Sequence, residues 1–510
     1  MIASALLAQT APVTDTATRV TEKIAMPAVD WVAILPSLIL IGGAMALLLV
    51  TSIVRIRRPP KHLYAAVTVA IAGASAIATE KLWERVRHGR AGAVIADAVK
   101  VDGFGVYLTL AICAAIALAV LIADDYLRRE GLDGVEFYVL ALLSGGGGVI
   151  MISANDLIVL FLGLEVLSIA LYILAGSHTR RVESQEAAMK YFVLGAFSSA
   201  VFLYGIALIY GATGSTNLGE ITTYLSTHVV FGNGLLLAGM ALLLVGLGFK
   251  VAAVPFHMWA PDVYQGAPTP AAGFMAAAAK AAGFAGLLRV FVTAFETQRL
   301  DWQPVVWTLA VLSMVVGSIL AVMQTDIKRM LAYSSISHAG FILVGMQAAT
   351  NDGVAGALFY LLAYTFIVLG TFAVITVVGR RGDAAHSLDS YKGLARRRPV
   401  LALVFTLFLL AQAGVPLTSG FVAKFGVIQA AVEAHSYALA MIAMVSAVIA
   451  AFFYLRVVVL MYMAEPEADA PALRIPIGIG VALVATAAFT LFAGILPQYL
   501  IDFAKSAVLG

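Results

Sequence analysis

Charged residues and cysteine are scarce in this sequence. Lys, Arg, Asp and Glu together make up 12% of the 510 residues, whereas an ordinary soluble domain has about 25%. Because 62% of the residues are hydrophobic, there are too few charges to cover the surface of a soluble protein of this length. The deficit excludes soluble enzymes, nucleic-acid binders and disordered scaffolds. It predicts instead that the main solvent is a lipid bilayer.

The lone cysteine and the small net charge exclude further classes. Cys113 by itself cannot form an internal disulfide, a CxxC redox pair or a cysteine-held iron–sulfur cluster. A net charge of +3 indicates no polyanionic partner, nucleic acid included. The sequence also has no P-loop, no GxGxxG motif in a βαβ setting and no dense His or Cys cluster. We therefore expect this chain itself to bind no cofactor and no metal.

Long apolar runs are abundant. A helix needs about 20 apolar residues to cross the hydrocarbon core of a bilayer. The runs are continuous and do not alternate in the ten-residue pattern of membrane strands. They predict an all-α polytopic membrane protein with about 14 transmembrane helices. The predicted spans begin near Trp31, Leu63, Phe104, Phe137, Asp156, Glu186, Gly234, Pro270, Pro304, Ile327, Val354, Pro399, Tyr437 and Pro476.

The connections between spans predict an orientation. Residues 1–30 hold an apolar patch with no basic region before it, which predicts an extra-membrane extension, with a cleaved signal peptide as the alternative. Basic residues are densest in the connections 55–62 and 380–398, which would lie on the same side of the membrane. The positive-inside rule then predicts a cytoplasmic location for that side and an outer location for both termini. The connection 80–101 departs from this rule because it is also basic.

Two short matches indicate an internal repeat. Asn155-Asp156-Leu157 resembles Thr325-Asp326-Ile327 at an offset of 170 residues, and Val254-Pro255 resembles Val415-Pro416 at an offset of 161. Both offsets equal five predicted spans, and an odd number of helices gives the two copies opposite topology, as in inverted-repeat transporters. Chance similarity is the alternative. The predicted domains are an N-terminal extension (1–30), helices 1–3 (31–136), repeat 1 (137–295), repeat 2 (303–462) and helix 14 (474–498).

A few charged residues lie well inside the predicted spans. The acidic one is Glu165, and the basic ones are Lys190, Lys250, Lys280, Arg289, Lys424 and Arg456. Because a charge at the bilayer centre costs at least about 2.5–3.5 kcal/mol, these side chains must face protein, pair with each other or line water. Arg289 and Arg456 lie near the ends of their spans, where we expect their long side chains to reach the headgroups.

The remaining five charges predict a proton relay. Burial in an apolar medium disfavours the charged forms of lysine and glutamate, so both can exchange protons near neutral pH. Arginine stays charged in proteins and could not serve. A row made of Lys190, Lys250, Lys280 and Lys424, with Glu165 as counter-charge, could pass protons sideways through bound water. Static ion pairs are the alternative for Lys250, Lys280, Lys424 and Glu165, and reach to the headgroups is the alternative for Lys190.

Two prolines predict helix breaks beside these lysines. Pro255 lies five residues after Lys250, and Pro416 lies eight residues before Lys424. A proline removes one backbone donor from a helix, so we expect broken helices at spans 7 and 12. Broken helices at membrane depth are tolerated where they are buried or line a wet cavity. Their carbonyl ends carry partial negative charge, which favours a nearby ammonium group. A simple packing kink is the alternative.

A polar cluster near the start of the tenth span adds two candidates. Tyr333 and His338 flank three serines there. Histidine titrates near neutral pH, so His338 and Tyr333 are possible hydration or relay residues. A satisfied core histidine is the alternative.

These stretches resemble the antiporter-like membrane subunits of respiratory complex I, the bacterial NADH–quinone oxidoreductase, and among them the subunit N type. The matching stretches are NDLIVLFLGLEVLSIALYIL from Asn155, EAAMKYFVLGAFSSA from Glu186, GFKVAAVPFHMWAPDVYQGAPTPAAGFMAAAAKAAGF from Gly248, DIKRMLAYSSISHAGF from Asp326 and GVPLTSGFVAKF from Gly414.

The resemblance implies a proton-translocating subunit in the plasma (inner) membrane of a bacterium. Glu165 and Lys250 would correspond to the family's switching pair, Lys190 and Lys280 to intermediate carriers, and Lys424 to the terminal lysine toward the outer exit. NADH, FMN, iron–sulfur clusters and quinone would reside in partner subunits, where electrons pass from NADH to quinone. The partners would be the other complex I membrane subunits and the lipid bilayer.

Two other functions remain open from the sequence. The chain could be a subunit of a multisubunit cation/proton antiporter, because such chains share this ancestry, or it could be a non-transporting scaffold. No dense carboxylate or carbonyl cage suited to sodium is visible in the sequence, so protons are the favoured ion.

Overall fold

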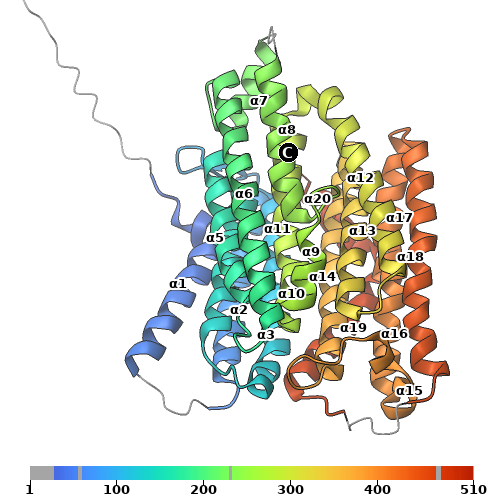
Figure 1. Cartoon of the computed structure of the whole chain (residues 1–510). Coiled ribbons are helices and arrows are strands. Elements are labelled where there is room, and N and C mark those ends of the chain that lie inside the picture. The colour runs from blue at the N-terminus through green and yellow to red at the C-terminus, as the bar shows by residue number, and fades with distance from the viewer. Residues whose placement is uncertain (1–27, 55–59, 229–232, 467–472, 509–510) are drawn as a thin grey trace, which may run out of the picture.

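The computed structural model describes residues 28–54, 60–228, 233–466 and 473–508. In these ranges helices stand side by side in one bundle (Figure 1). Twelve of the described helices are long and apolar enough to cross a membrane. The helix α13 and the pair α16 and α17, bounded below, complete the fourteen crossings predicted from sequence. The all-α multi-pass architecture is confirmed.

The N-terminal part has three long helices and a small hairpin. They are α1 (Trp31–Val54), α2 (Leu63–Arg87), β1 (Gly92–Val94), β2 (Val99–Val101) and α3 (Gly103–Glu130), with β1 antiparallel to β2. The expected connection 80–101 is therefore mostly structured, because α2 continues through its charged last turns and the hairpin fills most of the remainder. Most of the predicted 1–30 extension lies outside the described residues.

The next elements follow the predicted repeat 1. They are α4 (Glu136–Ser153), α5 (Leu157–Ala175), α6 (Val182–Thr213), the short α7 (Leu218–Thr227), α8 (Gly234–Val251) and α9 (Trp259–Gly266). The eighth span is a continuous helix with two π turns, and its parts are α10 (Thr269–Phe274), η1 (Met275–Ala279), α11 (Lys280–Leu288) and η2 (Arg289–Ala294).

The remaining elements follow the predicted repeat 2 and the last span. They are η3 (Glu296–Gln298), α12 (Arg299–Val322), α13 (Ile327–Ala348), α14 (Asn351–Val378), η4 (Leu388–Tyr391), α15 (Leu394–Arg397), α16 (Pro399–Ala413), α17 (Ser419–Glu433), α18 (Tyr437–Met463), α19 (Ile477–Ile495) and α20 (Gln498–Ser506). The amphipathic α20 lies beyond the last predicted span and was not expected.

Both predicted helix breaks are present. The helix α8 ends at Val251, and Ala252 takes a left-handed conformation with φ 58° before α9 begins. The helix α16 ends at Ala413, and Gly414 (φ 92°) and Leu417 (φ 67°) turn the chain into α17. Pro255 and Pro416 lie inside the two breaks. Spans 7 and 12 are thus each built from two half-helices.

Matching backbone contacts support the inverted repeat. Asp156, before α5, pairs with Asn217 as an isolated antiparallel bridge, and Asp326, before α13, pairs in the same way with Ser387. Each residue of the second pair lies 170 positions after its counterpart. The first bridge precedes α7 at the top of the bundle in Figure 1, whereas the second leads to α15 at the bottom. The two copies therefore run in opposite directions.

The same offset relates two close helix contacts. A Cβ placed on Gly147 of α4 would lie 2.5 Å from the backbone nitrogen of Leu167. A Cβ placed on Gly317 of α12 would lie 2.6 Å from the backbone nitrogen of Ser337. Both glycines allow two helix backbones to approach closely, as small residues do in membrane bundles.

Replacing either glycine is expected to destabilise the bundle. Gly147→Ala and Gly317→Ala would each force rigid backbone apart, which typically costs 1–3 kcal/mol. Gly73→Ala is the matched control, because a Cβ there meets nothing within 4 Å. Thermal unfolding in detergent should show lower melting temperatures for the first two variants only. Equal melting temperatures for all three would contradict the packing described.

Candidate functional site

Lys250 lies at the broken end of α8, in contact with hydroxyl groups. It is the second-last residue of α8 and is 5% exposed. Its ammonium group donates to Ser168 Oγ at 2.8 Å and to the Tyr191 hydroxyl at 3.4 Å. The Tyr191 ring stacks on Trp259 at 4.5 Å between centroids. The first half of span 7 thus presents a lysine to α5 and α6.

Glu165 lies one helical turn before Ser168 on α5. Its carboxylate is half-buried and accepts a hydrogen bond from the Ser199 hydroxyl of α6. No ion pair among the described residues joins Glu165 to Lys250. The predicted pair therefore has no direct bond. Lys250 instead bonds Ser168, which lies on the same helix as Glu165.

Lys280 lies at the centre of the bundle, where the π turn η1 passes into α11. It is 3% exposed and donates to Ser335 Oγ at 2.6 Å and to the Ser335 carbonyl oxygen. The Tyr364 ring centroid lies 5.4 Å from its nitrogen. Single π turns inside helices are frequent at functional sites. Repeat 1 thus delivers a lysine into the polar cluster of α13.

His338 connects that cluster to α14 and α18. Its Nδ1 lies 2.6 Å from the Tyr360 hydroxyl and its Nε2 lies 3.1 Å from the Tyr454 hydroxyl. The Tyr454 hydroxyl also bonds Ser334 and donates to Gln412 Oε1 at 3.4 Å. Sequence reasoning missed Tyr360, Tyr454 and Gln412, because a single tyrosine or glutamine in an apolar run carries no signal of its own.

Tyr333 lies apart from this cluster. It is half-buried and lies one turn after Arg329 on α13. The structure thus brings His338 into the polar network and leaves Tyr333 outside it.

Lys424 occupies the second helix break. Its ammonium group donates to the carbonyl oxygens of Gln412 at 2.8 Å and Ala413 at 3.0 Å, which are the last two residues of α16. The expected contact between a lysine and a half-helix carbonyl end is therefore present. Gly414 leaves room for it, because a Cβ there would lie 3.0 Å from Lys424 Cδ.

The three central lysines share one property. Lys250, Lys280 and Lys424 are each at most 5% exposed, and no described carboxylate lies within 4.0 Å of any of their nitrogens. Their hydrogen-bond partners are hydroxyl and carbonyl oxygens only. From Lys280 to Lys424 the contacts run through Ser335, its neighbour Ser334, and then Gln412. From α9, the Tyr264 hydroxyl lies 3.5 Å from Ser335 Oγ.

Lys190 departs from the expected row. Its side chain is 42% exposed and donates to Glu186 at 2.7 Å and Asp262 at 2.8 Å. Asp262 also accepts from Arg329 at 2.7 Å. These charges line a cavity of about 760 Å³ that reaches the basic connections. Lys190 therefore lies in a charged vestibule. Asp262 was missed because it lies just past the first helix break.

Arg289 corrects an expectation. Its guanidinium does not reach the headgroups: it is 1% exposed and pairs with both carboxylate oxygens of Asp102, at 2.8 and 3.0 Å. It also donates to the Ile152 carbonyl oxygen at 2.8 Å. Asp102 lies just before α3, far away in sequence, so its proximity could not be predicted. This pair is structural, because a bidentate guanidinium–carboxylate contact holds its geometry. Arg456 of α18, by contrast, donates to the carbonyl oxygens of Val322 and Gln324, where α12 ends, each at 3.3 Å.

A buried charge cluster around Asp383 was also missed. Lys328, on the first turn of α13, is fully buried and lies 3.3 Å from Asp383. Arg181 lies at the same distance, and Thr269 donates to Asp383 at 2.9 Å. Burial alone would raise the pKa of Asp383, but Lys328, His386 and Thr269 more than offset it and hold the pKa well below its usual range. The cluster joins the connection before α6, the start of α10, α13 and the loop after α14.

Comparison with known proteins gives the family. Residues 154–450 match the family model described as NADH:quinone oxidoreductase/Mrp antiporter, transmembrane. The chain belongs to this family. It is 43% identical over 475 residues to the NADH-quinone oxidoreductase subunit N of Trichlorobacter lovleyi, an alignment that covers 93% of this chain and 96% of the relative. The resemblance seen in the sequence is confirmed.

Solved structures agree with the fold. A chain of respiratory complex I from Thermus thermophilus with bound aureothin is 34% identical, with a TM-score of 0.77, covering 92% of this chain and all of the other. A chain of the Mrp complex from Dietzia sp. is 21% identical with a TM-score of 0.81, covering 93% and 96%. The second likeness supports the antiporter-like fold alone.

The Asp383 cluster makes a testable claim about stability. Asp383→Asn would leave Lys328 buried without its counter-charge, which typically costs 3–5 kcal/mol. Because the pKa of Asp383 is lowered by folding, its contribution is complete above the unfolded pKa of about 3.9 and is lost as the pH falls below it. We expect a much lower melting temperature for the variant at pH 7 and a smaller difference from wild type near pH 3.

The control is Asp389→Asn, in the same connection. Asp389 is 63% exposed and pairs with Lys392 at the surface, so its loss should change the free energy of unfolding by less than about 1 kcal/mol. Similar losses for both variants at pH 7 would contradict the assignment of Asp383 as the buried anchor.

Proposed function

We propose that this chain is a proton-translocating membrane subunit of an NADH–quinone oxidoreductase. The names of its close relatives and its full-length likeness to a complex I chain support this function. Electron transfer from NADH to quinone would take place in partner subunits, which would hold the FMN and the iron–sulfur clusters. This chain would contribute the proton path, with the other complex I membrane subunits as its partners.

The observation that carries the proposal is the burial of three lysines without a carboxylate partner. An isolated ammonium group in a low-dielectric interior is strongly disfavoured, so it tends to give up its proton when a neighbouring charge changes. Lysine can do this and arginine cannot. Static ion pairs, which the scaffold alternative requires, are absent from these three side chains within the described residues.

The first steps of the path use the basic end. Protons would enter the vestibule of Lys190 and Asp262 and pass to the Glu165 and Lys250 pair. When Glu165 is ionised it favours the ammonium form of Lys250. When Glu165 is neutral, that support is lost and the proton can leave. Ser168 and Tyr191 hold the Lys250 nitrogen in place, at 2.8 and 3.4 Å.

The later steps lead through repeat 2. Water would carry the proton from Lys250 to Lys280, as Tyr264 and Ser335 offer hydroxyl groups between the helices. From Lys280 the hydroxyl groups of Ser335, Ser334 and Tyr454 lead as far as Gln412, since a hydroxyl can both donate and accept. The carbonyl oxygen of Gln412 accepts from Lys424, and water would carry the proton over this last step. His338 contacts the Tyr454 hydroxyl and would help to hydrate this series of hydroxyl groups.

The same proposal fixes an orientation. The chain would lie in a bacterial plasma membrane with the end that holds Arg180, Arg380 and α15 in the cytoplasm, following the positive-inside rule. Both termini would then lie on the outer side, and Lys424 would release protons there.

Lys250→Ala should abolish proton transfer while the assembled enzyme remains intact. We expect proton pumping in proteoliposomes, measured with a pH-sensitive dye, to fall at least tenfold and NADH oxidation to fall with it. Lys250→Arg should not restore pumping, because arginine holds its proton. Lys505→Ala is the control, since Lys505 is 57% exposed and pairs with Asp352 at the surface. Normal pumping and electron flux in Lys250→Ala would contradict the proposed proton relay.

Glu165→Gln should produce a similar but weaker defect, because it removes the switching charge and leaves the lysine. The expected result is a several-fold loss of pumping with normal assembly. A sodium-dependent proton flux in the wild-type chain, insensitive to NADH, would favour the cation/proton antiporter function instead.

Lys424→Ala should block release on the outer side. The subunit should still assemble, because Lys424 bonds only two carbonyl oxygens and removal leaves no buried charge unpaired. Pumping should fall severely, and the assembly seen on a native gel should be unchanged. Pumping at the wild-type level by this variant would show that Lys424 is not part of the proton path.

A further inference from the structure

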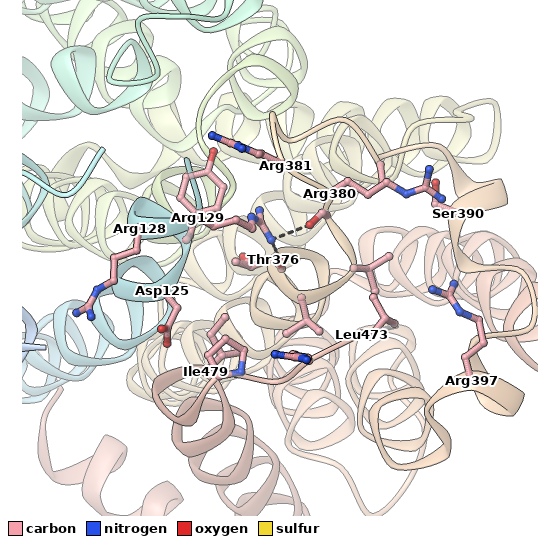
Figure 2. Close-up of a pocket in the computed structure, with 17 residues that line it drawn as sticks. Asp125, Arg128, Arg129, Thr376, Arg380, Arg381, Ser390, Arg397, Leu473 and Ile479 are labelled. Atoms are coloured by element: carbon pink, nitrogen blue, oxygen red, sulfur yellow. Dashed lines mark hydrogen bonds between the residues drawn. The ribbon is translucent and has the colours of Figure 1, made fainter. Parts of the chain in front are cut away.

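A second cavity, of about 710 Å³, lies at the basic end of the bundle and outside the proton path. It is formed where α3 and α14 end, where α15 lies and where α19 begins (Figure 2). The helices α3, α14 and α19 are far apart in sequence and belong to different parts of the fold. The cavity therefore depends on the assembled bundle rather than on one loop.

Arginine dominates its lining. Six arginines line it: Arg128, Arg129, Arg380, Arg381, Arg397 and Arg474. Figure 2 shows Arg128 and Arg129 on one side of the space, and Arg380 and Arg397 on the other. The only described acidic residue in the lining is Asp125. Basic residues are expected on this side of a membrane protein, but that rule does not require them to converge on one cavity.

The local ion pairs leave positive charge in the cavity. Arg128 pairs with Asp124 and Arg129 pairs with Glu130, each at 2.8 Å. Arg381 and Arg474, within the described part of the chain, have no carboxylate within 4.0 Å. Like charges that share a space repel each other by up to about 4 kcal/mol at close range. A bound anion would relieve this repulsion.

Apolar side chains also line the cavity. Val377 and Val378 end α14, and Leu473 and Ile479 flank the start of α19. Beside them, Ile477 is 83% exposed on the first turn of α19. A ligand in this cavity would therefore meet both guanidinium groups and apolar side chains. This combination matches a phosphate headgroup that carries acyl chains.

We propose that this cavity binds the phosphate group of an anionic phospholipid at the cytoplasmic boundary of the membrane. Guanidinium groups bind phosphate through paired hydrogen bonds, and Arg381 and Arg474 supply charge that no carboxylate among the described residues neutralises. The acyl chains would lie along α19. The bound lipid would join α3, α14 and α19 at the end of the bundle where the N-terminal helices, repeat 2 and the last span meet.

The test compares two double variants of the full-length, tagged chain, purified in detergent with the subunits that accompany it. Native mass spectrometry would follow titration with phosphatidylglycerol and, separately, with phosphatidylcholine. Wild type should retain phosphatidylglycerol and not phosphatidylcholine. Arg381→Gln with Arg474→Gln should weaken phosphatidylglycerol binding by about tenfold or more, since each basic residue near an anionic lipid contributes about 1 kcal/mol.

The matched control is Lys392→Gln with Arg396→Gln. These two residues lie at the same end of the bundle, pair with Asp389 and Glu465 at the surface, and do not line the cavity. This control should bind phosphatidylglycerol as wild type does. Equal binding by both double variants would overturn the site. Saturable binding of inorganic phosphate, with no preference for phosphatidylglycerol, would overturn the lipid and leave a free phosphate as the ligand.

Discussion

Burial of an ammonium group without a carboxylate beside it is the constraint on which the rest of this structure depends. An unpaired charge in the interior is costly, so every feature around Lys250, Lys280 and Lys424 compensates in part. Broken helices supply carbonyl oxygens, and neighbouring helices supply hydroxyl groups. Elsewhere the protein pairs its buried charges directly, as Arg289 does with Asp102. The two treatments separate charges that hold the fold from the charges that we propose to carry protons.

The inverted repeat places different side chains at matching positions. At the offset of 170 residues, Glu165 corresponds to Ser335, Ser168 to His338 and Lys190 to Tyr360. Repeat 1 thus carries the charged Glu165 and Lys190 where repeat 2 carries hydroxyl groups, and a serine where repeat 2 carries a histidine. Lys280 belongs to repeat 1 but bonds the serine that takes the place of Glu165 in repeat 2. The two repeats therefore meet at Lys280, which is why we place this lysine at the middle of the proposed path.

Much of this arrangement could be predicted from the sequence, because lipid makes every internal charge and every internal proline conspicuous. Spans, helix breaks and the three central lysines follow from that rule alone. What could not be predicted is pairing between distant segments. Asp102 and Asp383 lie in connections, where acidic residues are ordinary, yet the fold buries both against cations. The exposure of Lys190 was missed for a related reason. Its ammonium group bonds Asp262 of α9, the half-helix that follows the first break, and therefore lies in the vestibule.

The central claim is that a proton passes through Lys280, where the repeats meet. The most direct measurement is the number of protons translocated per NADH oxidised, in proteoliposomes that contain the enzyme with Lys280→Met in this chain. Methionine fills the space without a titratable group. The account predicts a lower proton yield per NADH, together with slower NADH oxidation and normal assembly. A wild-type proton yield at a wild-type rate of NADH oxidation would contradict it.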